Sequence, residues 1–164
     1  MTAMTLILVA RILHIVSSTI WAGFVIIAGL VLVNAPRDMK SEEVRRIRQS
    51  AIGRAARVVA PAAGVSLLSG LYLFYALHAG TRSGTEIALG IGALSAVVSF
   101  FVGALGSGGP ERQLAKLDAL GESRSPADQA SIRALNGRVV ASARVTATLL
   151  LVSAAAMAVA RFLS

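Results

Sequence analysis

The sequence predicts an all-α integral membrane protein: a four-helix bundle of antiparallel up-and-down topology, formed by a single transmembrane domain of residues 1–164. Hydrophobic residues make up 55% of the chain and charged residues only 15%, which is more apolar than an ordinary soluble domain. Four apolar runs are long enough to cross about 30 Å of hydrocarbon at about 1.5 Å per residue. The absence of cysteine excludes a disulfide scaffold, a thiolate metal site and cysteine catalysis.

The predicted spans cover residues 12–33, 58–77, 87–105 and 139–163. The first could begin as early as Thr5, because Thr5–Ala10 is apolar too. We do not expect the first to be a cleaved signal peptide, because no Lys or Arg precedes its apolar run and the run is too long. The third is short and rich in glycine and alanine. We predict that it is also a span, because the chain contains three other clear spans. The short segment between the second and third spans makes these two helices antiparallel neighbours.

The two long connections, residues 34–57 and 106–138, are expected to be cytoplasmic and partly helical. The segment Ser125-Pro126-Ala127-Asp128 is typical of a helix start, with a capping residue, a proline at the first position and an acid at the third. The segment Gly106-Ser107-Gly108-Gly109-Pro110 lacks the lysine of a phosphate-binding loop. It predicts a helix break instead.

Lys and Arg are distributed unequally over the two predicted sides. Thirteen lie in or beside the two long connections, whereas only Arg11, Arg82 and Arg161 lie on the other side. Because cytoplasmic connections retain positive charge, both termini are expected on the periplasmic side of a bacterial inner membrane. This topology explains the net charge of +8. The lipid bilayer is the expected partner, and no nucleic acid is expected, because no aromatic residues interleave with the basic clusters.

The candidate metal ligands are the two histidines of the chain, His14 and His78. Both lie near the outer ends of their predicted spans, so antiparallel neighbouring helices would place them at a similar depth. Ionisable side chains at membrane depth are functional candidates because burying them is costly. The alternative is that both imidazoles lie at the water interface and bond to headgroups.

The residues around the histidines suit a cofactor. Hydroxyl groups on the same helical face can hold a ligating imidazole in one tautomer, and arginines at the outer surface can bind a haem propionate or can simply extend into the interface. The candidate cofactor-binding residues are His14, His78, Arg11, Ser17, Ser18, Trp21, Tyr75, Arg82 and Arg161.

Copper is an alternative cofactor, because Met4 and Met157 also fall toward the outer side and their thioethers could join the imidazoles. A proton relay is not expected, because the spans contain no carboxylate. Hydrolytic catalysis is not expected either, because no serine lies in a nucleophile elbow. No catalytic residue is assigned. If the protein is an enzyme, we expect a haem-dependent membrane oxidoreductase.

The segment Arg11-Ile12-Leu13-His14 continuing to Trp21-Ala22-Gly23 resembles the first span of CopD-like bacterial inner-membrane proteins, and Leu68-Ser69-Gly70-Leu71 is similar to their second span. The resemblance extends over nearly the whole chain, and most of it is generic membrane sequence. It implies copper uptake or resistance, or, by similarity to HemJ-like protoporphyrinogen oxidases, a b-type haem bound through a first-span histidine that His14 matches.

The sequence thus favours a protein that binds haem b near its outer face, for electron transfer or redox sensing, with a redox partner or a quinone. Ligation by both histidines and by His14 alone stay open at this point. The alternatives are a copper transport or resistance protein and a cofactor-free accessory subunit. A homodimer and a larger membrane complex are both compatible with the small residues of the third and fourth spans.

Overall fold

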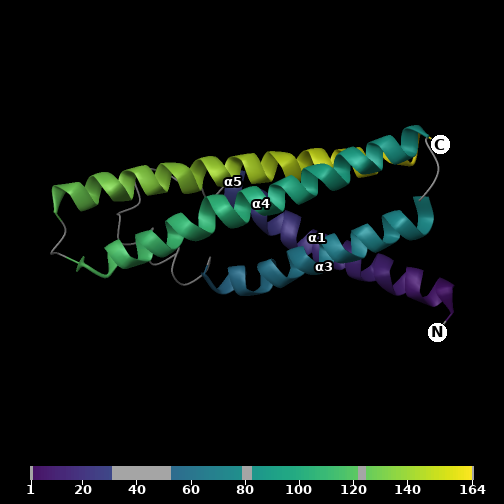
Figure 1. Cartoon of the computed structure of the whole chain (residues 1–164), viewed down its shortest axis with the longest axis horizontal. Coiled ribbons are helices and arrows are strands. Elements are labelled where there is room, and N and C mark those ends of the chain that lie inside the picture. Colours follow the sequence, from purple (N-terminus) through teal and green to yellow (C-terminus); the bar gives the residue numbers. More distant parts are fainter. Residues whose placement is uncertain (1, 31–52, 79–82, 122–124, 164) are drawn as a thin grey trace.

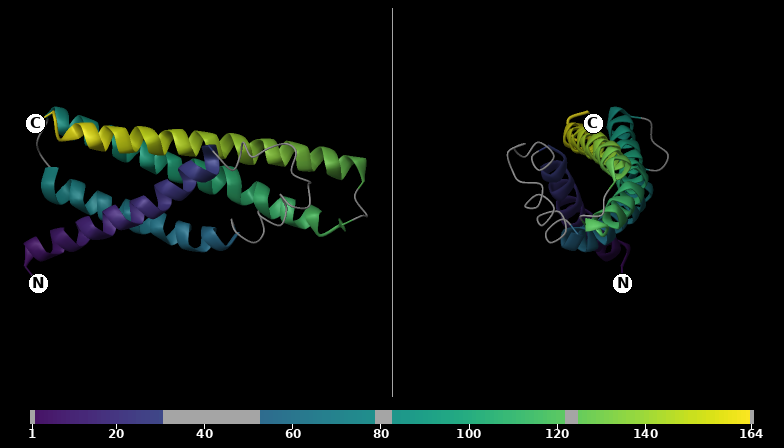
Figure 2. Two further views of the ribbon diagram at one scale, coloured as in Figure 1. Left: turned by 180° about the vertical axis from the view of Figure 1, so that it is seen from behind. Right: turned by 90° about the vertical axis from the view of Figure 1, so that its left-hand side faces the viewer.

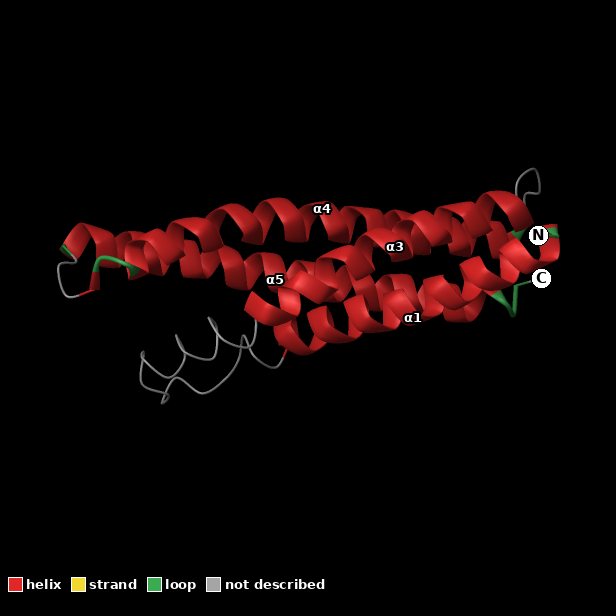
Figure 3. Ribbon diagram, turned by 90° about the horizontal axis from the view of Figure 1, so that it is seen from below, coloured by secondary structure: helices red, strands yellow, loops and turns green. Residues whose placement is uncertain are grey.

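The computed structural model describes residues 2–30, 53–78, 83–121 and 125–163, and their regular structure is helical (Figure 3). The helices are α1 (Ala3–Leu30), α3 (Gly53–His78), α4 (Gly84–Asp118) and α5 (Pro126–Ala160). Each contains a segment that is long and apolar enough to cross a membrane. The prediction of an all-α protein with four apolar helices is confirmed for the described part of the chain. Arg82 and most of the predicted connection 34–57 lie outside these residues.

The start of α5 follows the predicted capping pattern. The backbone N–H of Ser125 donates to the Asp128 carboxylate at 2.8 Å, and the Asp128 N–H donates to the Ser125 hydroxyl at 3.2 Å. Pro126 occupies the first helical position, where a missing N–H costs nothing. At the start of α4, Glu86 likewise accepts from the N–H of Ser83. Local side chains therefore satisfy amide groups that a helix start leaves without a partner.

The predicted helix break at residues 106–110 is wrong, because α4 runs without interruption from Gly84 to Asp118. Packing against α5 explains the continuity. A Cβ atom at Gly106 would clash with Ser142, and the Ser142 hydroxyl donates to the carbonyl of Val102 at 2.9 Å. Tertiary contact thus outweighs the poor helix propensity of glycine and proline.

Two of the helices are longer than a membrane requires. α4 and α5 each have 35 residues, which is about 52 Å at 1.5 Å per residue, against a hydrocarbon core of about 30 Å. Figure 1 shows their hairpin projecting beyond the ends of α1 and α3. Leu114 and Leu135 are buried within this extension. The second predicted connection is therefore helical over residues 106–118 and 126–138, as expected of a partly helical connection.

The register of α4 on α5 is marked by hydroxyl groups that bond to backbone carbonyls of the partner helix. Thr85 donates to Ala160 at 3.1 Å, and Ser99 donates to Thr146 at 3.2 Å. Early residues of α4 meet late residues of α5, so the two helices run in opposite directions. Such bonds satisfy hydroxyl groups that cannot reach water inside a bilayer.

The four helices close a ring, with α1 against α3 and α5, and α4 against α5 and α3. Both chain ends lie at the same end of this bundle (Figures 1 and 2). One residue from each helix forms the central cluster: Trp21, Ala63, Ala96 and Leu150. The Trp21 ring meets Phe100 edge-on at 6.4 Å. The single tryptophan therefore fills the space that the small residues of α3 and α4 leave.

Gly29 allows α1 to approach α5 closely. A Cβ atom there would lie 2.5 Å from the carbonyl oxygen of Ala143 and 2.9 Å from the Ala147 Cβ. We expect Gly29→Ala to destabilise the protein by about 1–3 kcal/mol, because rigid atoms must move apart. Gly23→Ala is the matched control on the same helix, since nothing lies within 4 Å of its added Cβ. Melting in detergent checks this: equal melting temperatures for the two variants would contradict the close approach.

Candidate functional site

His14 is anchored to the neighbouring helix. Its Nδ1 lies 2.9 Å from the carbonyl oxygen of Ser66 on α3. A carbonyl oxygen can only accept, so in the neutral ring Nδ1 carries the proton and Nε2 carries the lone pair. Among the described residues no hydrogen bond reaches Nε2. The site therefore presents one oriented imidazole with a free electron pair.

Gly70 makes this anchor possible. It lies one helical turn after Ser66, and a Cβ atom on it would be 2.7 Å from Cε1 of His14 and 3.0 Å from Nδ1. No real Cβ atom tolerates such a separation from a ring held by packing. The imidazole thus lies directly against the backbone of α3.

The predicted hydroxyl partners of the imidazole bond elsewhere. Ser17 donates to the carbonyl of Leu13 at 2.5 Å, and Ser18 donates to that of Ile15 at 3.1 Å. Both bonds stay within α1. The partner that the structure gives to His14 is a main-chain carbonyl, which the sequence analysis did not predict. The only signal for it in the sequence was Gly70, which allows a neighbouring side chain to approach the backbone.

His78 is the last residue of α3. Its ring stacks on Phe74 at 6.1 Å and 25°, and its Nδ1 is buried with no hydrogen-bond partner among the described residues. It lies eight residues beyond Gly70, which is about 12 Å along the helix axis.

The expectation that the two histidines share one depth is wrong. α1 begins at Ala3 rather than near residue 12, so His14 lies about 16 Å from the start of its helix, whereas His78 lies at the end of its own. The apolar residues Thr5–Ala10 precede residue 12 and belong to α1, which agrees with the earlier start that their apolar character allowed. The structure places the His14 ring at Ser66 and Gly70 and the His78 ring at Phe74, and does not bring the two together.

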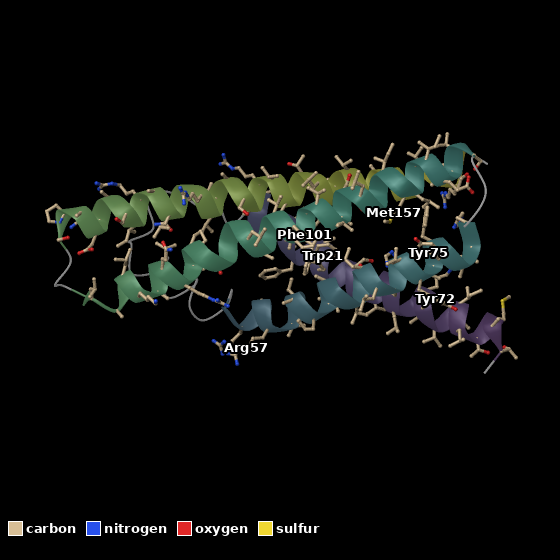
Figure 4. All side chains as sticks on the ribbon, in the orientation of Figure 1. Trp21, Arg57, Tyr72, Tyr75, Phe101 and Met157 are labelled. Atoms are coloured by element: carbon tan, nitrogen blue, oxygen red, sulfur yellow. The ribbon has the colours of Figure 1, made fainter. Side chains whose placement is uncertain are left out.

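The other predicted site residues are dispersed. Arg11 is exposed one turn before His14 on α1, whereas Trp21 is 5% exposed in the central cluster. Tyr75 is 67% exposed and lies toward the end that carries the termini (Figure 4). Arg161 is exposed and its guanidinium lies 4.6 Å from the centre of the Phe162 ring. Within about one helical turn of His14 on α1 lie Arg11, Ser17 and Ser18.

The two methionines predicted as thioether ligands of copper, Met4 and Met157, lie on different helices. Met4 is 77% exposed, and Met157 packs on α4, where its Cγ lies 3.2 Å from the position of a Cβ on Gly92. The described ranges contain no group of three or more His, Asp or Glu side chains that could hold a metal ion.

Comparison with protein-family models, with curated proteins and with solved structures found no match to this chain. The resemblance to CopD-like proteins therefore stays a prediction.

Proposed function

We propose that the chain is a membrane protein that binds a b-type haem through Nε2 of His14 and serves electron transfer or redox sensing. The hydrogen bond from Nδ1 of His14 to the carbonyl of Ser66 carries this proposal. Histidines that ligate a metal almost always donate their other ring N–H to a carbonyl, a carboxylate or water, which fixes the ring and raises its basicity. An imidazole at a helix interface with that bond and a free Nε2 would be suited to hold a haem iron.

Each residue of the site has a distinct task. Ser66 holds the tautomer of His14 through its carbonyl, and Gly70 leaves room for the ring. The exposed guanidinium of Arg11, one turn toward the helix start, supplies the positive charge that a haem propionate requires. When bound, the haem supplies one-electron chemistry.

His14 is proposed as the single protein ligand, because the His78 ring lies at a different depth. A haem with one imidazole ligand keeps a position for a diatomic gas. The test is the optical spectrum of the protein purified in mild detergent from haem-sufficient cells, oxidised, dithionite-reduced, and reduced with carbon monoxide. We expect a Soret band that shifts with carbon monoxide. Sharp bands of the reduced protein that do not shift with carbon monoxide would refute the single-ligand form. The absence of a Soret band would refute haem binding.

We also propose that the termini face the periplasm and that the α4–α5 hairpin faces the cytoplasm of a bacterial inner membrane. The excess of Lys and Arg on the hairpin side and the common location of the two chain ends support this orientation (Figure 1).

Single-cysteine labelling tests the orientation without background, because the chain has no cysteine. Thr2 and Ser125 are both exposed and lie at the chain start and at the hairpin tip. In intact spheroplasts we expect an impermeant maleimide to label Thr2→Cys and to spare Ser125→Cys until the membrane is broken. The reverse pattern would invert the topology.

A further inference from the structure

The carbonyl oxygen of Ser66 has more donors than lone pairs. Helix geometry directs the N–H of Gly70 to it, and Nδ1 of His14 lies at 2.9 Å. The hydroxyl of Ser69 is a third donor at 3.2 Å, and the same hydroxyl lies 2.5 Å from the carbonyl of Val65. Since a carbonyl oxygen has two lone pairs, Ser69 and His14 compete for one acceptor.

The competition takes place away from water. Ser66 is 3% exposed and Ser69 is 9% exposed, so bulk water has little access to the atoms that compete. Hydrogen bonds in such surroundings are electrostatically stronger than in water. The single proton of the Ser69 hydroxyl can serve either the Val65 carbonyl or the Ser66 carbonyl. When the proton goes to Val65, a lone pair of the Ser66 carbonyl is available to His14.

We propose that Ser69 is a positioning residue that sets the strength of the bond from His14 to Ser66 and thereby tunes the reduction potential of a haem at His14. The last step rests on the proposed function. A stronger bond at Nδ1 makes Nε2 a better electron donor, which stabilises the oxidised metal and lowers the potential. Ser69 acts through the Ser66 carbonyl, to which its hydroxyl donates.

Ser17 provides a matched control. It is buried, and its hydroxyl lies 2.5 Å from the carbonyl of Leu13 and 3.4 Å from that of His14. Like Ser69, it therefore bonds to the carbonyls four and three residues before it on its own helix. Neither of these carbonyls accepts the imidazole proton, which goes to Ser66. Ser17→Ala therefore removes an equivalent buried hydroxyl without changing the acceptor of His14.

The first test uses the haem-free protein. In detergent-solubilised protein labelled with ¹⁵N-histidine, the Nδ1 proton of His14 is followed by NMR. We expect Ser69→Ala to move this proton downfield, as a shortened hydrogen bond does, while Ser17→Ala and Ser69→Thr leave it near the wild-type position. An unmoved signal in Ser69→Ala, in protein that still elutes as one species, would overturn the proposal.

The second test is a redox titration of the haem-loaded proteins. We expect a lower midpoint potential in Ser69→Ala and wild-type potentials in Ser17→Ala and Ser69→Thr. An unchanged potential would overturn the tuning role. Failure of the wild type to take up haem would instead refute the proposed function, and the NMR test would still decide whether Ser69 competes with His14.

Discussion

Replacing His14 by glycine is expected to abolish haem binding, and free imidazole is expected to restore it. His14 supplies the only imidazole that the structure anchors with Nε2 free. Its removal leaves a space for a small ring between α1 and Gly70. Haem occupancy measured from the Soret band should fall at least about tenfold, since even the loss of a supporting partner of a ligand costs about 10–100-fold in affinity.

The matched control for this prediction is His78→Gln, which removes the other imidazole of the chain. Its ring stacks on Phe74 rather than on the His14 site, so the occupancy should stay at the wild-type level. If His78→Gln lost haem and His14→Gly retained it, the haem ligand would be His78 at the end of α3, which would contradict the account.

Gly70→Ala is expected to weaken haem binding by about 10–100-fold with His14 still present, because the support of a ligand is nearly as important as the ligand. The added Cβ would lie 2.7 Å from Cε1 of the ring and 3.0 Å from Nδ1. The ring must therefore leave the Ser66 carbonyl, which frees its tautomer and its orientation. Haem titration gives the affinity, and melting of the haem-free protein separates this effect from unfolding.

Gly64→Ala is the control for Gly70→Ala, because it adds the same methyl group to the same helix where nothing lies within 4 Å. It should leave the haem affinity unchanged and raise helix stability by at most about 1 kcal/mol. Equal affinities for the two variants would mean that the contact between Gly70 and His14 does not govern the site.

Much of the fold follows from local sequence. Hydropathy predicts four apolar helices because a bilayer requires about 20 apolar residues per span, and Ser125-Pro126 predicts the start of α5 because caps act locally. The segment Gly106–Pro110 misled the prediction for the opposite reason. The helix continues through this segment because it packs against Ser142 of α5. Local helix propensity does not take account of such a contact between residues distant in sequence.

The candidate site was predicted only in part. His14 is conspicuous as an ionisable residue within an apolar run, yet its depth depended on where α1 begins, and hydropathy defines helix ends poorly. The partner of the imidazole could not be predicted, because every residue has a carbonyl and only packing selects that of Ser66. Ser17 and Ser18 were expected to serve the ring, but a hydroxyl on a helix readily bonds to its own backbone instead.

The most direct measurement of the central claim is a titration of haem into haem-free wild-type protein and into His14→Gln, purified in the same detergent and followed by Soret absorbance. We expect the wild type to saturate at about one haem per chain, because one anchored imidazole suffices for one haem. His14→Gln should show only the unsaturated rise of haem dissolved in detergent. Identical curves for the two proteins, or a wild type that never saturates, would contradict the account.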